Sequence, residues 1–101
     1  MSAPATVHVL PTETVVLAAF DVSIASIVSL QVTNLDGSQT FDGTVYVALG
    51  SMSLAPTPVA ELTGVGPGVS RVAQVDVRGV SRLELRGVMS GVGGDVSVAA
   101  A

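Results

Sequence analysis

Apolar and polar residues alternate with a period of two along most of the chain. Residues 28–33 read Val-Ser-Leu-Gln-Val-Thr, and the same alternation recurs in 44–49, 74–78, 82–86 and 95–98. A period of two places one set of side chains on a buried face of a strand and the other set on a wet face. Residues 14–22 are apolar at nearly every position, which predicts a strand that lies centrally or is covered on both faces.

Turn-forming residues separate these runs. Asp36-Gly37 and Asp42-Gly43 are expected to supply the positive φ of tight turns, and the glycine-rich segments 64–68 and 91–94 are expected to be loops. Short strands without helical segments between them predict an all-β, antiparallel two-sheet β-sandwich, jelly-roll or Ig-like, of about seven or eight strands. We expect strands at 6–10, 14–22, 27–34, 43–50, 58–63, 70–78, 81–88 and 95–100.

The composition is that of one small folded domain. The chain has 101 residues, of which 49% are hydrophobic and only 3% aromatic, and 20 are valines. Valine favours strands over helices, and a core of valine and leucine predicts a monomer of modest stability that assembly would stabilise further. We expect residues 1–11 to form an N-terminal arm or a first edge strand and residues 12–101 to form the sandwich.

The charge pattern argues against nucleic acid and membrane partners. The net charge is −4 and the basic residues are four arginines, so a phosphate backbone would be repelled. The uncharged stretch 43–60 is interrupted by Gly50 and two prolines, so we do not expect it to span a membrane. The first residues show no basic, apolar leader pattern, so we expect synthesis in the cytoplasm without a secretory signal.

The chain lacks the residue sets that catalysis or metal binding usually needs. There is no cysteine, and His8 is the single histidine, so thiolate and multi-histidine metal sites are not expected. The glycine-rich segment 64–68 lacks the rest of a phosphate-binding loop, and no nucleophile elbow is present. We therefore expect a protein that is not an enzyme and that has no cofactor and no metal.

Two groups of residues are candidates for contacts with a partner. Arginines alternate with acids near the C-terminal half, which predicts either cross-strand charge ladders on a wet face or an arginine-rich interface. The N-terminal segment 2–10 is either a frayed terminus or an arm that lies across a neighbouring subunit. The candidate interaction residues are Ser2, Ala3, Pro4, Ala5, Thr6, Val7, His8, Arg78, Arg82 and Arg86.

One stretch of the sequence supports a resemblance to a known class of proteins. The order of features runs from Ala19-Phe-Asp-Val-Ser23 through Ser29-Leu-Gln-Val-Thr-Asn34 and Gly43-Thr-Val-Tyr-Val47 to Val75-Asp-Val-Arg-Gly-Val-Ser-Arg-Leu-Glu-Leu-Arg-Gly87, and closes with Ser90-Gly-Val-Gly-Gly-Asp-Val-Ser-Val98. This order resembles small β-sandwich proteins of bacteriophage virions, which include head decoration (cement) proteins and modules of fibre and adhesion proteins.

The resemblance implies a structural function. It implies a decoration protein, made in the host cytoplasm, that binds the outer capsid surface as a homo-trimer and stabilises contacts between subunits of the major capsid protein. The segment 2–10 would act as a clamp, so deleting it would leave a folded β-protein that no longer binds capsids. The alternatives are a carbohydrate-binding or adhesion module, for which Phe20, Phe41 and Tyr46 are the available aromatic residues, and a neck or tail structural protein.

Overall fold

Eight strands make up the regular structure of the chain. The computed structural model describes residues 5–20, 27–49 and 57–100, and no helix occurs within these ranges. The strands are β1 (Ala5–Val9), β2 (Thr14–Phe20), β3 (Ile27–Asn34), β4 (Phe41–Leu49), β5 (Thr57–Val65), β6 (Ser70–Asp76), β7 (Val80–Met89) and β8 (Gly94–Ala100). Each overlaps one strand that the sequence predicts, so the predicted all-β class and strand positions are confirmed.

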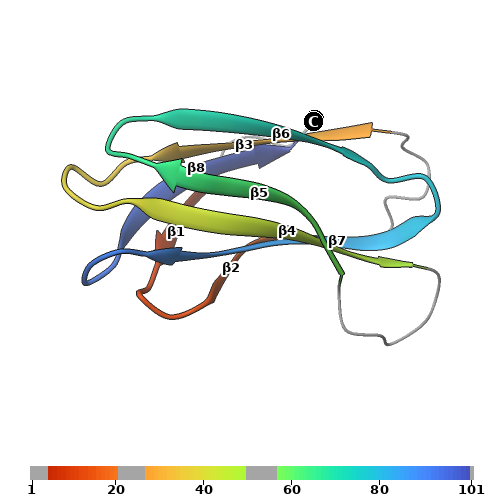
Figure 1. Cartoon of the computed structure of the whole chain (residues 1–101), viewed down its shortest axis with the longest axis horizontal. Helices are drawn as coiled ribbons and strands as arrows, with labels where there is room; N and C mark the ends of the chain where they lie inside the picture. The colour runs from red at the N-terminus through yellow and green to blue at the C-terminus, as the bar shows by residue number, and fades with distance from the viewer. Residues whose placement is uncertain (1–4, 21–26, 50–56, 101) are drawn as a thin grey trace.

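The strands form two antiparallel four-stranded sheets packed as a sandwich (Figure 1). The first sheet has the order β1-β8-β3-β6 and the second the order β2-β7-β4-β5. The chain therefore folds as four long antiparallel pairs, β1 with β8, β2 with β7, β3 with β6 and β4 with β5, which is the arrangement of a jelly roll. An Ig-like sandwich would place the first two strands in one sheet, whereas β1 and β2 lie in different sheets here.

A core of branched aliphatic side chains fills the space between the sheets. Alternate residues of each strand point inward, as the period of two requires. The largest fully buried side chains are Phe41, Leu30, Leu83, Leu85 and Met89. Most of the others are valines, as the composition suggested: Val9, Val16, Val32, Val45, Val47, Val65, Val75, Val77, Val80, Val96 and Val98.

The position of β2 differs from the sequence prediction. Residues 14–22 were expected to form a central or doubly covered strand, but β2 is an edge strand of the second sheet. Val15 is 50% exposed and Ala18 is also exposed, and the register with β7 shifts between Val15 and Leu17. The shift lets Val16 enter the core, and an irregular edge strand of this kind resists pairing with another chain.

Two glycines that were expected to supply a positive φ in turns do not do so, although Gly37 lies in the β3–β4 loop as predicted. Neither Gly37 nor Gly43 has a positive φ; the described positive-φ glycines are Gly64, Gly68, Gly79 and Gly93. Gly43 lies inside β4, which begins at Phe41 rather than at the predicted residue 43. Hence Asp42-Gly43 is part of a strand and not a turn.

Gly43 and Gly87 make room for the ring of Phe41. The two glycines are direct partners in the β4–β7 register, and both face the core. A Cβ atom at Gly43 would lie 2.8 Å from Cε2 of Phe41, and one at Gly87 would overlap the ring atoms Cε1 and Cζ. The packing of the largest buried side chain thus requires the absence of side chains at both positions.

We expect Gly87→Ala to lower the free energy of unfolding by about 1–3 kcal/mol, because the added methyl group overpacks the core against Phe41. Urea unfolding measures the change. Gly37→Ala is the matched control, since nothing lies within 4 Å of a Cβ there. The combination of Gly87→Ala with Phe41→Leu should be less destabilising than the sum of the two single changes; strict additivity would contradict the proposed contact.

Candidate interaction surface

The predicted N-terminal residues belong to the sheet. Ala5, Thr6, Val7 and His8 lie in β1, which pairs with β8 over five residues, and the following Val9 is fully buried. The segment is therefore an edge strand of the first sheet. Ser2, Ala3 and Pro4 lie outside the described residues. Because deletion of residues 2–10 would remove this strand and a core side chain, we no longer expect the deletion to leave the fold intact.

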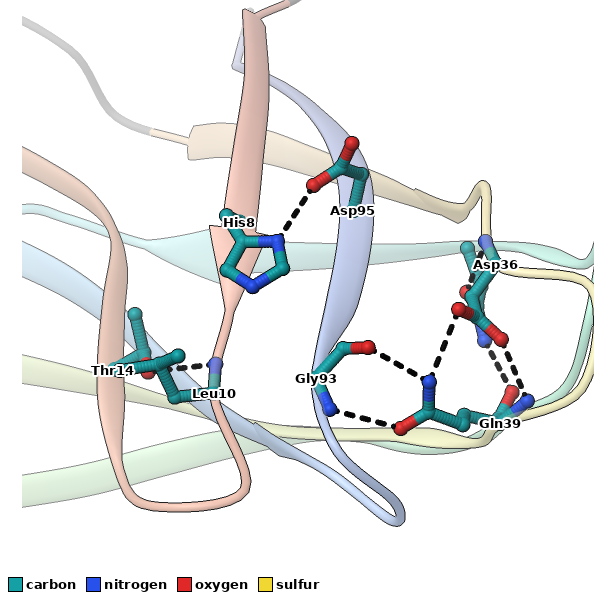
Figure 2. Close-up of polar contacts among 8 residues, drawn as sticks. His8, Leu10, Thr14, Asp36, Gln39, Gly93 and Asp95 are labelled. Atoms are coloured by element: carbon teal, nitrogen blue, oxygen red, sulfur yellow. Dashed lines mark hydrogen bonds and ion pairs between the residues drawn. The ribbon is translucent and has the colours of Figure 1, made fainter.

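His8 lies beside an acidic residue of the neighbouring strand. Its Nδ1 atom is 2.9 Å from Oδ1 of Asp95, and both side chains are more than half exposed. The two residues are direct partners in the β1–β8 register, which explains the contact. Figure 2 shows the pair on the outside of the first sheet. An exposed pair of this kind contributes little to stability.

Arg78 lies in the turn between β6 and β7. Its guanidinium donates hydrogen bonds to both carboxylate oxygens of Asp76, and its backbone N–H also donates to Oδ1 at 3.0 Å. These bonds, led by those from the side chain, lower the pKa of Asp76 to about 2. Both side chains are exposed. The pair stabilises the turn, and the carboxylate of Asp76 balances the charge of Arg78.

Arg82 and Arg86 lie on the outer face of the second sheet. Arg86 contacts Glu84 at 2.7 Å and Glu13 at 2.9 Å, and its guanidinium lies 5.3 Å from the centre of the Tyr46 ring. Arg82 lies 3.8 Å from Glu84. The hydrogen bond to Glu13, followed in size by the one to Glu84, raises the pKa of Arg86 above its ordinary value. Both arginines are thus matched by nearby acids, Glu84 on the same strand and, for Arg86, also Glu13 in the β1–β2 loop.

The predicted cross-strand charge ladder does not form. It required β6 and β7 to be neighbours, but they lie in different sheets, so Asp76 and Arg78 do not face Arg82 and Arg86. The pairs form instead between residues two apart on one strand, as in Arg86 with Glu84. The structure therefore brings Arg82 and Arg86 together and separates them from Arg78 and from β1.

A different surface arises where four loops meet at one end of the sandwich. The β1–β2, β3–β4, β5–β6 and β7–β8 loops, which are residues 10–13, 35–40, 66–69 and 90–93, gather toward the left of Figure 1. We call these residues the loop end. Backbone hydrogen bonds link the loops to neighbouring segments: Met89 N donates to Leu10 O, Leu35 N to Asp95 O, and Asn34 N to Val69 O, each at 3.0 Å.

Asn34 joins the β3–β4 loop to the end of β5 from inside the sandwich. It is fully buried, and its Nδ2 atom donates to the carbonyl of Gln39 at 2.7 Å and to that of Val65 at 2.9 Å. Its Oδ1 atom accepts a hydrogen bond from the backbone N–H of Asp36 at 2.9 Å. One buried amide thus satisfies three backbone groups, which fixes the β3–β4 loop against the end of β5.

Gln39 joins the β3–β4 loop to the β7–β8 loop (Figure 2). Its Nε2 atom donates to the carbonyl of Gly93 at 2.7 Å and to Oδ2 of Asp36 at 3.0 Å, and its Oε1 atom accepts from Gly93 N at 3.0 Å. Asp36 also accepts from the backbone N–H groups of Ser38 and Gln39, both at 2.8 Å, and these bonds lower the pKa of Asp36. The loop end is therefore a rigid, hydrogen-bonded unit.

Each of the four loops carries one exposed apolar side chain. The exposed fractions are 46% for Leu10, 53% for Leu35, 38% for Val69 and 90% for Val92. Four of the eight exposed large hydrophobic residues that the structure describes thus lie on the loop end. Scattered single apolar residues are ordinary on a surface, but several at one end indicate a binding surface.

Sequence reasoning missed this surface because it treated each loop as a connection. A local signal was present: each residue stands beside turn formers, as in Leu10-Pro11, Gly68-Val69 and Gly91-Val92-Gly93, where polar residues are usual. Only the strand order, however, shows that these four loops meet at one end.

Within the described residues, no group of three or more histidine, cysteine, aspartate or glutamate side chains is arranged to hold a metal ion. None of the described elements is a helix long and apolar enough to cross a membrane. The arrangement at the loop end, rigid loops with exposed apolar side chains, is suited to binding another surface. Comparisons with protein-family models, curated proteins and solved structures gave no significant match.

We expect Asn34→Ala to lower the free energy of unfolding by about 2 kcal/mol or more, because it leaves two carbonyls and one N–H without their buried partner. Chemical unfolding measures this, and amide exchange in residues 35–40 should speed up. Ser38→Ala, which removes only an exposed 3.3 Å contact, is the control and should be nearly neutral. Equal effects of the two changes would contradict the role assigned to Asn34.

The stability that Asp36 provides should depend on pH. Its pKa is lowered in the folded state, so the ionised form stabilises the fold above the ordinary value of 3.8 and this stabilisation is lost as the pH falls below it. Asp36→Asn should therefore lower the melting temperature near neutral pH and make progressively less difference in acid. A difference that stays constant across this range would contradict ionic hydrogen bonding at the loop end.

Proposed function

We propose that this protein is a structural, non-enzymatic component of a bacteriophage virion, a decoration protein that binds the outer surface of the head. The loop end carries this proposal: four exposed apolar side chains are held on a hydrogen-bonded platform, which is an arrangement for docking onto another protein. The jelly-roll order is consistent with it, since viral capsid proteins use this architecture, although a fold alone does not define a function.

In this proposal the loop end replaces the N-terminal segment as the clamp. Residues 5–9 form strand β1 and pair with β8, whereas the loop residues are not part of a sheet and can contact another protein. Complete burial of a valine or leucine side chain is worth about 1.5–3 kcal/mol, and a micromolar complex needs about 8 kcal/mol. Four tips entering pockets together supply much of that, and the rigid loops reduce the entropy lost on binding.

The binding would stabilise contacts between subunits of the major capsid protein. A ligand that binds the assembled shell, and not its separated subunits, raises the stability of the assembled state by mass action. A protein whose loop end spans a boundary between two subunits has this property. The resemblance also leads us to expect that the protein binds as a homo-trimer. The number of copies bound to each capsid at saturation tests this expectation.

The carbohydrate-binding alternative receives less support from the described side chains. Sugar rings usually stack on an accessible aromatic face. Phe41 is fully buried and Tyr46 lies under the guanidinium of Arg86, while the side chain of Phe20 lies outside the described residues. A neck or tail protein would use the same loop end. Binding experiments with heads and with tails, done separately, distinguish this alternative from a head protein.

We expect the purified protein to co-sediment saturably with mature heads that lack it and to raise their disassembly temperature. Leu35→Ser combined with Val92→Ser should weaken binding by at least roughly tenfold, because two apolar contacts are lost. Ile27→Ser combined with Val59→Ser is the matched control: these side chains are 58% and 48% exposed and lie outside the loop end. Equal binding by the two double variants would show that the loop end is not the contact surface. Binding to tails and not to heads would contradict the assignment to the head.

A further inference from the structure

The four edge strands of the two sheets differ in how well they are protected from pairing with another chain. β1 is short, with five residues. β2 bulges between Val15 and Leu17, where its register with β7 shifts. β5 has two register shifts in its pairing with β4, and it contains Pro58, which has no N–H to donate. Short length, bulges and proline are the usual means by which natural sheets block their edges.

The remaining edge strand, β6, has none of these features. It pairs with β3 over seven consecutive residues, from Ser70 opposite Thr33 to Asp76 opposite Ile27, without a register shift. In an antiparallel pair, every second residue points its N–H and C=O groups away from the partner strand. Within the part of the chain that the structure describes, no further backbone hydrogen bond involves residues 70–76. β6, at the top of Figure 1, thus presents a regular row of backbone donors and acceptors to solvent.

The apolar side chains of β6 would gain burial from a neighbouring strand. Val72 lies on the outer face of the sheet, opposite Gln31, and is 61% exposed. Ala73 points inward and is only half-buried at the margin of the core. Cross-strand neighbours pack side by side on each face of a sheet. A fifth strand would therefore cover Val72 on one face and Ala73 on the other.

Arg71 determines which kind of strand this edge can accept. It lies opposite the buried Val32 and so stands on the inward side of β6, but its side chain is exposed. The other three arginines form ion pairs, whereas Arg71 has no ion pair among the described residues. An inward charge at an edge disfavours pairing with an apolar strand. A strand with a carboxylate beside the guanidinium would satisfy the charge.

A second copy of β6 does not supply this carboxylate. Its inward residues are Arg71, Ala73 and Val75, and an antiparallel copy would place these inward residues opposite one another. Each guanidinium would then face an apolar side chain or another arginine. Asp76 is the single acid of β6, but it stands on the outer face and is held by Arg78. The edge therefore selects against its own copy.

We propose that β6 accepts an extended, acidic segment of another protein, which adds a fifth strand to the first sheet. The segment has apolar residues facing the core margin and a carboxylate beside Arg71. In strand addition of this kind, main-chain hydrogen bonds supply the affinity and alternate side chains supply the specificity. The ion pair lies at an exposed edge, so it contributes a modest preference.

Peptide capture on the free protein tests the proposal, and it requires no virus particle and no loop-end contact. The chain has no cysteine, so Gln74→Cys places a single thiol on the outer face of β6. The probe is the capped peptide Glu-Thr-Val-Cys-Val-Thr-Glu, in which both valines face inward when the cysteine faces outward. Its glutamates lie three residues from the cysteine on either side, so one reaches Arg71 in either strand direction. The competing peptide has lysine in place of both glutamates.

The two peptides compete for the thiol in a reversible disulfide exchange buffer, and mass spectrometry measures the fraction of each captured. We expect the glutamate peptide to be captured roughly threefold or more in excess, because it pairs with Arg71 and the lysine peptide is repelled. The net charge of −4 would by itself favour the lysine peptide, so this preference reports the local contact.

Two further variants make the test specific. Arg71→Glu, added to Gln74→Cys, should reverse the preference, and circular dichroism checks that each variant is folded. Ala18→Cys, at an exposed position of the bulged edge strand β2, is the matched control and should show no preference for the glutamate peptide. Equal capture of the two peptides at position 74, the same preference at position 18, or no reversal with Arg71→Glu would overturn the proposal. So would a homodimer linked through position 74 that forms in preference to either peptide adduct, because a second copy would then be the occupant.

Discussion

The buried amide of Asn34 is the interaction on which the order of the loop end depends. A jelly roll brings four loops to one end, but loops without internal order would lose entropy on binding. Asn34 removes much of that cost, because its three hydrogen bonds fix the β3–β4 loop to its own strand and to β5. Gln39 extends the same network to Gly93, so side-chain hydrogen bonds connect the β3–β4 and β7–β8 loops. Backbone hydrogen bonds add the β5–β6 loop, through Asn34 with Gly68 and Val69, and the β1–β2 loop, through Leu10 with Met89.

The inner faces of the two sheets form the core, and their outer faces differ in charge. Their inner faces form a core of valine and leucine, in which the ring of Phe41 is accommodated only because Gly43 and Gly87 lack side chains. The outer face of the second sheet satisfies its own charges through pairs such as Arg86 with Glu84. The middle of the outer face of the first sheet carries uncharged side chains such as Thr33 and Ser97, with the pair of His8 and Asp95 nearer the loop end. A small, valine-rich chain can therefore satisfy the charges of one outer face internally while its exposed apolar side chains gather at the loop end.

The sequence predicted local structure well and long-range structure poorly, for a physical reason. Alternation reports which side of a strand is buried, and together with apolar runs and the turn-forming residues between them it located all eight strands. It does not report which strands are neighbours. The arginine ladder failed because β6 and β7 enter different sheets, and Gly43 was misread because its role depends on Phe41. The loop end depends on strand order in the same way, so its isolated residues, such as Val92, looked like ordinary turn positions.

Amide hydrogen exchange of the protein free and bound to saturating heads tests the central claim most directly, because it locates the contact without any substitution. The account predicts that binding slows exchange in the loops at residues 10–13, 35–40, 66–69 and 90–93, and most of all around the exposed side chains of Leu35 and Val92. Slower exchange confined to β1 or to the outer face of the second sheet would contradict it.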